Sequence, residues 1–417
     1  MRTILHSDLN NFYASVELLK HPEYKDMPVA VCGNKEDRHG IVLAKNQIAK
    51  SFGVSTGEVI WSAKKKCKNL VTFPADFPAY LRVSKAVRDI YARYTDKIES
   101  FGIDECWLDV TESIKLFGTG EEIAEKIRTE IKTEIGVTVS IGVSFNKVFA
   151  KLGSDMKKPD AITVISPENY KQLVWRLPVS DLLYVGKATE KKLCSIGVHT
   201  IGDVANCNEK VLVNLLGVWG KNLYTYACGL DDSPVMDKRA EEGAKSISNS
   251  LTNYRDAISR DEVFTLILLL AESVAGRLRE SGLGKAETVR LGITDSELNG
   301  YGRQMKLSMP TSSAQTIANA CYELFDKFYN WSNPVRGVTV GVSGFTHGVE
   351  QLGFGLENER EKKEDKLDKT IDQIRRKYGN NSVQRATILK DSRLAQTDIK
   401  GEHLIHPAGV KDLPSDL

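Results

Sequence analysis

The apolar residues at the start of the chain form a short run that stops at an acid. Residues 3–7 have the pattern of a short strand that ends at Asp8, and the apolar spacing of residues 14–19 predicts a helix directly after it. Between them, residues 9–13 place free backbone N–H groups at a helix start, where the helix dipole favours an anion. This order of strand, acid and helix predicts a point where a metal ion and a phosphate meet.

The pattern then alternates between helix-like and strand-like segments. Residues 20–75 are short and mixed, which predicts a small inserted subdomain. Two amphipathic helices and two strands are predicted after it, at 80–95 and 120–134 and at 98–110 and 137–144. Strands interleaved with helices indicate an α+β layer, with Asp8 and the Asp104–Glu105 pair on one sheet.

Beyond Pro178 the pattern changes to short helices joined by glycine. Residues 182–204 predict two short helices with a glycine turn, and residues 231–244 form a charged connector. Longer helices and strands are expected at 245–346. Residues 356–378 predict a highly charged helix with Leu367, Ile371 and Ile374 on one stripe. The remainder has little pattern, and we expect it to be mobile or ordered by a partner.

The composition of the chain indicates the class of protein and its cellular compartment. The chain has 417 residues, 41% of them hydrophobic and 27% charged, which is typical of a globular protein of two to four domains. The net charge of +2 gives no whole-chain attraction to a polyanion, so a nucleic-acid surface would require local segregation of charge. The seven scattered cysteines contain no Cys-x-x-Cys pair, and the chain has neither a signal peptide nor a long apolar run. These features predict a cytoplasmic protein with reduced thiols and no membrane span.

Three carboxylates are the candidate catalytic groups. Asp104 and Glu105 lie in an otherwise apolar strand sequence, residues 101–110, where acids are costly unless they bind something. Taken singly, Asp8 could merely cap the following helix, and the Asp104–Glu105 pair could be a surface pair. Asp109 is as readily paired with a nearby base and is left out of the candidate set.

Four motifs follow one another along the chain. They are His6-Ser7-Asp8-Leu9-Asn10-Asn11-Phe12-Tyr13-Ala14-Ser15-Val16-Glu17, Ile103-Asp104-Glu105-Cys106-Trp107-Leu108-Asp109-Val110-Thr111, Gly142-Val143-Ser144-Phe145-Asn146-Lys147-Val148-Phe149-Ala150-Lys151 and Ser154-Asp155-Met156-Lys157-Lys158-Pro159-Asp160-Ala161. In this order they resemble the Y-family DNA polymerases, most closely the bacterial polymerase IV and UmuC branches. Four spaced motifs over this length are far more specific than one short match.

The resemblance implies a multidomain α+β fold arranged as a right hand, with a ferredoxin-like palm, small fingers, a helix-hairpin-helix thumb and an α/β little finger. The implied boundaries are palm 1–10 and 76–165, fingers 11–75, thumb 166–231, linker 232–244, little finger 245–346 and tail 347–417. The implied activity is template-directed addition of dNTPs to a primer, with low fidelity and bypass of lesions in DNA repair.

The resemblance also assigns ligands to two Mg²⁺ ions, with Mn²⁺ as a possible substitute. Asp8, Asp104 and the main-chain carbonyl of Leu9 would hold the ion on the triphosphate side. Asp8, Asp104 and Glu105 would share the ion that activates the primer hydroxyl. Three crowded carboxylates without metal would repel one another, and the ions would relieve this repulsion.

The implied dNTP site adds residues from two further segments. Lys158 is expected at the β- and γ-phosphates, with Lys157 a near-equal rival and a solvated lysine pair the simpler alternative. Where the family commonly has a tyrosine and an arginine facing the triphosphate, this chain has Gln47 and Lys50. Lys50 keeps the charge but loses the bidentate fork, so nucleotide affinity or fidelity could differ.

The segment Asn11-Phe12-Tyr13 completes this site. Tyr13 matches the family's sugar gate, an aromatic ring that collides with a ribose 2′ hydroxyl. Phe12 is expected to pack on the core, and core packing is also the alternative for Tyr13.

Two segments are candidates for contact with DNA. Gly186, Lys187 and Gly197 belong to a predicted helix-hairpin-helix, whose glycine turns let backbone N–H groups approach phosphates. An ordinary helical hairpin is the alternative. Region 245–346 is not obviously basic, and its DNA contact is inferred from the resemblance alone.

Near the tail, Gln351, Leu352 and Phe354 resemble a peptide that binds a sliding clamp. The copy is imperfect because Gly355 stands where a further aromatic is usual, and a plain linker is the alternative. His403 and His406 have no third ligand nearby and are read as solvent-facing. The expected partners are primer-template DNA, dNTP and a sliding clamp, and the protein is expected to be a monomer with no membrane contact.

Two other functions share some of these features. A nucleotide cyclase also uses two metals on a triphosphate, but the helix-hairpin-helix and the lysine segment argue against it. A non-catalytic DNA- or clamp-binding relative is the other alternative, and the intact set of Asp8, Asp104 and Glu105 argues against that.

Overall fold

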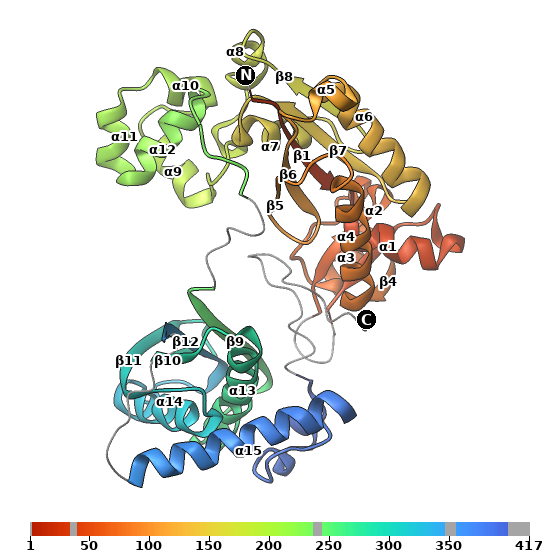
Figure 1. Ribbon diagram of the computed structural model, residues 1–417. Helices are drawn as coiled ribbons and strands as arrows, with labels where there is room; N and C mark the ends of the chain where they lie inside the picture. The colour runs from red at the N-terminus through yellow and green to blue at the C-terminus, as the bar shows by residue number, and fades with distance from the viewer. Residues whose placement is uncertain (1, 34–39, 237–243, 347–355, 399–417) are drawn as a thin grey trace. The chain divides into compact units, whose positions relative to one another are not determined.

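The computed structural model describes residues 2–33, 40–236, 244–346 and 356–398 (Figure 1). The chain divides into two compact units. The first is built mainly from residues 1–33 and 41–241, and the second mainly from residues 242–404. Each unit has its own hydrophobic core. The α+β multidomain class predicted from the sequence is therefore confirmed. None of the described helices is both long enough and apolar enough to span a bilayer.

The first unit is centred on a five-stranded sheet in the order β5-β6-β1-β7-β8. Its strands are β1 (Ile4–Leu9), β5 (Ile98–Ser100), β6 (Glu105–Asp109), β7 (Val139–Ser144) and β8 (Ile162–Ile165). Strand β1 lies in the middle and pairs antiparallel with both β6 and β7. The acid that the sequence places at the end of the first strand therefore lies on the central strand of the sheet.

Successive residues of β1 face opposite sides of this sheet. Leu5 and Leu9 belong to the core that also contains residues of α4 (Phe77–Tyr91) and α6 (Gly120–Glu130). His6 and Asp8 point to the other side, where both contact residues of the α7 segment. One face of the sheet is thus an apolar core, and the opposite face carries polar groups under α7 (Lys147–Met156).

A smaller three-stranded sheet, in the order β3-β2-β4, has its own cluster of buried residues. Its elements are α1 (Phe12–Lys20), η1 (Pro22–Tyr24), β2 (Val29–Cys32), β3 (Val42–Lys45), α2 (Gln47–Ser51), α3 (Ile60–Lys66) and β4 (Val71–Pro74). Asn46 caps α2 by accepting a hydrogen bond from the Ala49 N–H. The three strands and helices α2 and α3 lie within residues 20–75, where the mixed pattern predicts a small inserted subdomain.

Short helices connect and follow the strands of this sheet. Those between β6 and β7 include α5 (Ile114–Phe117) and η2 (Ile131–Ile135). Those after β8 are α8 (Tyr170–Val174), η3 (Val179–Asp181), α9 (Lys187–Cys194), α10 (Ile201–Asn206), α11 (Glu209–Leu216) and α12 (Val218–Ala227). Gly197 lies between α9 and α10 with a φ of 79°, a left-handed conformation that favours glycine. The predicted pair of short helices joined by a glycine turn is confirmed.

The second unit contains a four-stranded antiparallel sheet in the order β11-β10-β12-β9. Its elements are β9 (Ser246–Ala257), α13 (Arg260–Ser281), β10 (Lys285–Asp295), β11 (Gly300–Thr311), α14 (Ala314–Phe328) and β12 (Val335–Thr346). Helices α13 and α14 pack against the sheet, and their apolar residues share one core with Val338, Val340 and Val342 of β12. The longer helices and strands expected at 245–346 are present.

Helix α15 (Leu356–Tyr378) has the bounds predicted from the sequence, but only part of the expected stripe is covered. Ile371 and Ile374 are half-buried and Leu367 is exposed. Asp368, in contrast, is buried and accepts hydrogen bonds from the guanidinium of Arg279 and from the N–H of Ala314. The helix therefore packs on the unit through charged side chains, which an apolar pattern cannot reveal.

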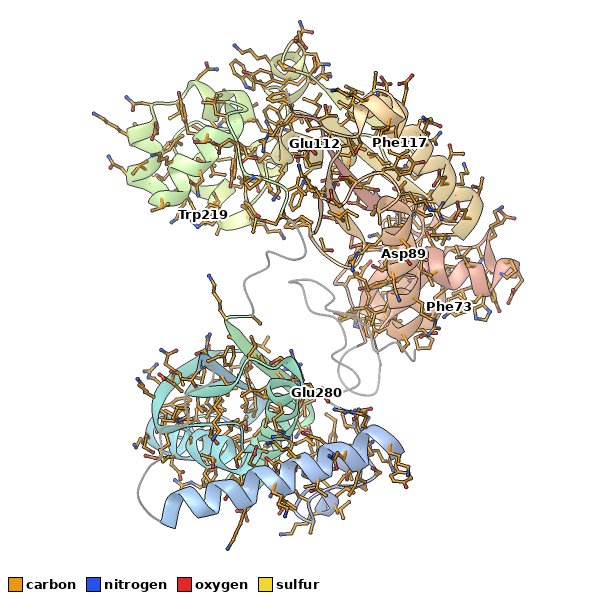
Figure 2. The ribbon with its side chains drawn as sticks, in the orientation of Figure 1. Phe73, Asp89, Glu112, Phe117, Trp219 and Glu280 are labelled. Carbon is orange, nitrogen blue, oxygen red and sulfur yellow. The ribbon has the colours of Figure 1, made fainter. Side chains whose placement is uncertain are left out.

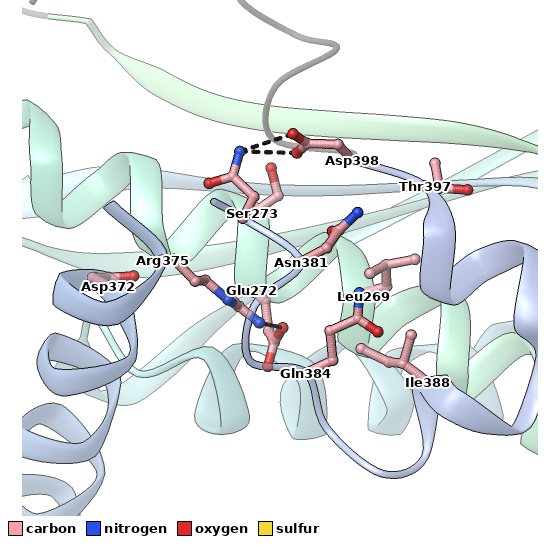
Figure 3. A pocket seen from close by; sticks show the side chains of 11 residues that line it. Leu269, Glu272, Ser273, Asp372, Arg375, Asn381, Gln384, Ile388, Thr397 and Asp398 are labelled. Carbon is pink, nitrogen blue, oxygen red and sulfur yellow. Dashed lines mark hydrogen bonds and ion pairs between the residues drawn. The ribbon is translucent and has the colours of Figure 1, made fainter. Parts of the chain in front are cut away.

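The expectation that the chain has no packed structure after this helix is wrong for residues 379–398. Ile388 of η5 (Ile388–Lys390) and Leu394 of α16 (Ser392–Gln396) belong to the core of the second unit. Figure 3 shows Glu272 of α13 facing Arg375 of α15 beside this segment. Within the segment, Arg385 pairs with the same buried Glu272 at 2.7 Å, a contact that a search for apolar periodicity does not detect.

Candidate active site

Asp8 lies almost at the end of the central strand, opposite one of the two other candidate acids. In the pairing of β1 with β6, Asp8 is directly opposite Glu105. Directly opposed residues in an antiparallel pair have Cβ atoms roughly 4.5–5.5 Å apart. Two acids that are distant in the sequence are therefore close neighbours because of strand register.

Asp104 lies in a turn, which corrects the prediction of one strand through residues 101–110. Strands β5 and β6 form a hairpin, and the Phe101 N–H donates a hydrogen bond to the Glu105 carbonyl oxygen at 2.9 Å. The turn between them contains Gly102, and Asp104 is its last residue. Asp104 is therefore carried by a turn rather than by a strand, and its side chain is still half-buried there.

Helix α4 and strand β1 hold this turn in place. Ser84 donates a hydrogen bond to the Ile103 carbonyl oxygen, and Arg88 donates to the Gly102 carbonyl oxygen at 2.9 Å. The Leu9 N–H donates to the Asp104 carbonyl oxygen at 3.0 Å. These three bonds fix the backbone on which the Asp104 side chain is carried.

Two lysines reach the acids from the α7 segment. The Lys158 ammonium lies 2.7 Å from Asp8 Oδ2, and the Lys151 ammonium lies 3.3 Å from the same oxygen. Lys151 also lies 2.9 Å from Glu105 Oε1. Both lysines pair with Asp155 on the exposed side of the cluster. Lys157 has no ion pair within the described residues, so the geometry separates two lysines that the sequence leaves as near-equals.

Burial and neighbouring charges shift the pKa values of the clustered side chains. Burial, together with the charges of Asp8 and Glu105, raises the pKa of Asp104 to about 6. Burial also raises the pKa of Asp8, against the opposing charge of Lys158. Burial opposes the charge of Lys151, but the carboxylates of Glu105, Asp155 and Asp8 raise its pKa overall. Perturbed groups gathered in this way are typical of functional sites.

The donor set fits a hard divalent cation in its chemistry. Mg²⁺ prefers carboxylate oxygens, and Asp8, Asp104 and Glu105 supply them on one side of the sheet. Within the described ranges, no group of three or more His, Cys, Asp or Glu side chains is closed into a metal-binding arrangement. The ammonium of Lys151 bridges Asp8 and Glu105 instead.

His6 was not among the residues singled out from the sequence. It is fully buried on the same face of β1 as Asp8, and its Nδ1 lies 2.8 Å from the Ser154 hydroxyl oxygen. Among the described residues its Nε2 has no hydrogen-bond partner, and it lies 3.6 Å from Glu105 Oε2. The spacing of two residues from Asp8 was the available signal, because alternate residues of a strand share a face.

The segment after Asp8 turns sharply into α1. Asn11 has a φ of 51°, which is unusual for a residue other than glycine, and its side chain does not cap the helix. Phe12 is buried in the core, as expected, so only its backbone is left to face a nucleotide. Tyr13 is half-buried and stacks on Tyr80 with the ring centroids 4.4 Å apart. Burial and the charge of Asp104 raise the pKa of Tyr13 to about 12, which keeps the phenol neutral beside the acids.

Gln47 and Lys50 lie on α2, outside the acidic cluster. Gln47 is half-buried and Lys50 is exposed at the end of this short helix. Burial and the charge of Lys50 lower the pKa of Lys45, so two ammonium groups lie near each other. The structure brings neither Gln47 nor Lys50 into hydrogen-bond contact with Asp8, Asp104 or Glu105.

The α9–α12 segment of the first unit has exposed basic and aromatic side chains. Gly186 caps α9, and Lys187 is exposed at the first position of that helix. Tyr184 has a φ of 68° and lies with its ring centroid 5.4 Å from that of Trp219, and both side chains are exposed. Figure 2 shows Trp219 at the edge of this segment. Gln351, Leu352 and Phe354, the candidate clamp-binding residues, lie outside the described residues, as do His403 and His406.

One face of the four-stranded sheet carries small and polar residues. Between the core residues of β12 lie Thr339 and Gly341, which pair with Gly292 and Arg290 of β10. On the other side of β12 the same two residues pair with Ser250 and Ser248 of β9. Helices α13 and α14 share the core with the alternate residues. The face therefore carries hydroxyl groups and glycines together with the exposed side chains of Arg290 and, on β11, of Gln304 and Lys306.

Models of known families match two parts of the chain. Residues 7–155 match the impB/mucB/samB family, and residues 244–354 match the C-terminal domain of the same family. The first match contains Asp8, Asp104, Glu105 and Lys151. The second covers the four-stranded sheet.

Curated relatives match almost the whole chain. The chain is 52% identical over 395 residues to a DNA polymerase IV of Acetivibrio thermocellus, covering 94% of this chain and 99% of the relative. It is 34% identical over 397 residues to DNA polymerase IV 1 of Bacillus subtilis, covering 93% and 94%. A solved Y-family DNA polymerase chimera of Dbh and Dpo4 superposes with a TM-score of 0.73 at 23% identity, covering 83% of this chain and 100% of the chimera.

Proposed function

The chain belongs to the impB/mucB/samB family of Y-family DNA polymerases, and we propose that it uses Asp8, Asp104 and Glu105 to hold two divalent metal ions during template-directed DNA synthesis. It is a DNA-directed DNA polymerase of the translesion class. The observation that carries the proposal for the site is the register of β1 and β6, which sets Asp8 opposite Glu105 beside the turn of Asp104.

Bound divalent ions would stabilise the entering and leaving oxygens of nucleotidyl transfer. Asp8 and Asp104, with the carbonyl of Leu9, are the proposed ligands of the ion on the triphosphate side, and Asp8, Asp104 and Glu105 those of the other. Ser84 and Arg88 hold the turn that carries Asp104, and the paired strands hold Asp8 and Glu105. Rigid placement of the ligands removes reorganisation from the reaction.

We propose that Lys158 contacts the β- and γ-phosphates of the incoming dNTP. Its ammonium already lies at the Asp8 carboxylate, so a phosphate brought to the same acid by a metal ion would meet it. The backbone of Asn11 and Phe12, at the start of α1, would face the triphosphate, and Gln47 and Lys50 of α2 would contact it from the fingers. The single charge of Lys50 supports weaker, less directional binding than an arginine fork.

Tyr13 is the proposed sugar gate. Its ring is held by the stack on Tyr80 and by an edge contact with Phe77 at a centroid distance of 6.0 Å. A ring fixed between two others cannot move aside cheaply when a ribose 2′ hydroxyl approaches. This packing supports selection of deoxynucleotides by shape.

Two surfaces are proposed to hold primer-template DNA. In the α9–α12 segment, the backbone at Gly186 and Gly197 and the side chain of Lys187 would contact phosphates without base choice. In the second unit, the sheet face that carries Arg290 would lie along the DNA backbone. A contact of this kind would not need an excess of basic residues in region 245–346. A sliding clamp is a further proposed partner through Gln351, Leu352 and Phe354, and the protein is proposed to act as a monomer.

Primer extension tests this function. The full-length chain is incubated with Mg²⁺, each dNTP and a primer on undamaged and abasic templates. Wild type is expected to add the nucleotide that the template specifies, and Asp104→Ala is expected to add none. Asp109→Ala is the matched control, because Asp109 ends the strand that follows Asp104 but its carboxylate accepts hydrogen bonds from Thr111.

The alternative of a non-catalytic DNA-binding relative makes a different prediction in the same experiment. Wild type would then bind primer-template DNA without extending it, and metal and dNTP would not change the affinity. Such a result would rule out the proposed catalytic role of Asp8, Asp104 and Glu105. Family membership disfavours the nucleotide cyclase alternative.

A further inference from the structure

Lys151 occupies the space between two of the proposed metal ligands. Its ammonium lies 2.9 Å from Glu105 Oε1 and 3.3 Å from Asp8 Oδ2, so it bridges the two strands that carry these acids. The Lys151 side chain is only 14% exposed. Lys158, in contrast, contacts Asp8 and Asp155 but not Glu105 within the described residues. Bridging of the opposed acids is thus the role of Lys151.

Close helix packing gives Lys151 this reach. Gly142 of β7 and Gly153 of α7 face each other, and a Cβ on Gly153 would lie 3.0 Å from the Gly142 Cα. A Cβ on Gly142 would overlap the Ala150 carbonyl oxygen. The backbone of helix α7 therefore packs directly on the backbone of β7, with no room for a side chain at Gly142. Any larger residue at either glycine would push the helix, and Lys151 with it, away from the acids.

The surrounding polar groups fix the same turn of the helix. Ser154 donates a hydrogen bond to the Lys151 carbonyl oxygen at 2.8 Å, and the same hydroxyl contacts buried His6. His6 in turn lies beside Glu105. The Lys151 backbone is thereby tied to strand β1, on which Asp8 lies.

Three acids at one place need compensating positive charge. Buried carboxylates that lie together repel one another, and an opposite charge within about 4–6 Å relieves this. We propose that Lys151 is a positioning residue that stands in for a divalent ion, holding Asp8 and Glu105 together in the metal-free protein and releasing their oxygens when metal binds. This inference rests on the proposed function, because it takes Asp8 and Glu105 as metal ligands.

Competition between Lys151 and metal has two linked consequences. Removal of the ammonium destabilises the metal-free protein, since Glu105 loses its lysine partner and Asp8 keeps only Lys158. The same removal strengthens metal binding, because the ion no longer has to displace an internal cation. A residue that merely supports the fold would give the first effect without the second.

The test compares Lys151→Met with Lys147→Met in the full-length chain. Lys147 lies one turn earlier on α7, is 13% exposed and pairs with Glu99 at 2.7 Å, so it matches Lys151 in burial and pairing but does not contact the proposed ligands. Thermal unfolding is measured in EDTA and in saturating Mn²⁺, and Mn²⁺ affinity is measured by calorimetry. Neither readout requires catalysis.

Lys151→Met is expected to bind Mn²⁺ about tenfold more tightly than wild type. Its midpoint of unfolding should fall in EDTA and return toward that of wild type in Mn²⁺. Lys147→Met should keep the Mn²⁺ affinity of wild type, and its midpoint should fall equally in both conditions. Lys151→Arg keeps a positive charge between the acids, so it should bind Mn²⁺ no more tightly than wild type, even if the methionine variant does not fold.

Equal Mn²⁺ affinity of wild type and Lys151→Met would overturn the inference, as would a loss of stability that Mn²⁺ does not reverse. Tighter binding by Lys151→Arg would also contradict it. If wild type binds no Mn²⁺, the proposed metal site itself fails. If wild type binds Mn²⁺ and Lys151→Met binds it equally, the site stands and only the role of Lys151 is rejected.

Discussion

The ammonium of Lys158 lies 2.7 Å from Oδ2 of Asp8, although 150 residues separate the two in the chain. Asp8 is the residue before the last of the central strand, and Lys158 follows the end of α7. Lys157, its neighbour in sequence, reaches none of the three acids through an ion pair in the described structure. Lys158, and not Lys157, is therefore placed to contact a phosphate that a metal ion brings to Asp8.

Lys158→Ala is expected to raise the KM for dNTP about tenfold or more, because a charge-assisted contact to the phosphates is lost. Lys157→Ala is the matched control and should leave KM within about twofold. Steady-state single-nucleotide incorporation measures both. A larger effect at Lys157 than at Lys158 would mean that the phosphate contact has been assigned to the wrong lysine.

Tyr13→Ala is expected to raise the incorporation of ribonucleotides relative to deoxynucleotides about tenfold or more, since the fixed ring no longer opposes the 2′ hydroxyl. Tyr13→Phe keeps the ring and its stack on Tyr80, so discrimination should remain close to that of wild type. The measurement is kcat/KM for a matched dNTP and rNTP pair. Unchanged discrimination in Tyr13→Ala would exclude the ring as the sugar gate.

The pKa of Asp104 predicts a pH dependence with a definite sign. Burial and the neighbouring acids raise this pKa from 3.8 to about 6 in the metal-free fold, so the neutral acid is favoured. Its contribution to stability is present below pH 3.8 and is lost as the pH rises through 6. Metal binding requires the ionised form, so Mn²⁺ should stabilise the protein more at pH 7.5 than at pH 5.

Thermal unfolding with EDTA and with Mn²⁺ at both pH values measures this dependence. Asp104→Asn provides the reference, because it removes the titrating group and leaves the other acids in place. Subtracting its profile from that of wild type isolates Asp104. A Mn²⁺ effect that is as large at pH 5 as at pH 7.5 would contradict the assignment of Asp104 as a ligand.

The packing of α15 predicts a large loss of stability when one buried charge is removed. Arg279 pairs with Asp368 at 3.2 Å and with Asp372 at 2.6 Å, and all three side chains are largely buried. Arg279→Ala leaves Asp368 and Asp372 without this partner and should lower the free energy of unfolding by about 3–5 kcal/mol.

Lys369→Ala is the control for this experiment. Lys369 is on the same helix and pairs with Asp365 at 2.7 Å, but its side chain is 62% exposed. Its removal should change the free energy of unfolding by about 1 kcal/mol or less. Urea unfolding followed by circular dichroism compares the two variants. Equal effects would show that burial of the ion pair does not determine its importance.

Part of the fold and of the site could be predicted because they depend on local signals. The strand ending at Asp8 and the helix at residues 356–378 follow from short-range periodicity, and both are present. The grouping of Asp8 with Asp104 and Glu105 came from family motifs, since the sequence alone does not give strand register. The register of β1 and β6 supplies the physical reason for it.

The remainder depends on contacts between distant residues. The turn at Asp104 depends on hydrogen bonds from Ser84 and Arg88, and the bridge made by Lys151 depends on how closely α7 packs at Gly142. The order of residues conceals such contacts. The helical spacing of Lys151 and Asp155 was nevertheless a usable signal, because residues four apart share one face of a helix.

The central claim is that Asp8, Asp104 and Glu105 hold two divalent ions during nucleotidyl transfer, and anomalous diffraction tests it most directly. Crystals of the full-length protein with primer-template DNA, a non-hydrolysable dNTP analogue and Mn²⁺ are measured at the manganese absorption edge. We predict two anomalous peaks roughly 3.5–4 Å apart, both in contact with Asp8 and Asp104, with Glu105 on one of them. A well-ordered complex with no peak at these carboxylates, or with Mn²⁺ bound elsewhere, would contradict the account.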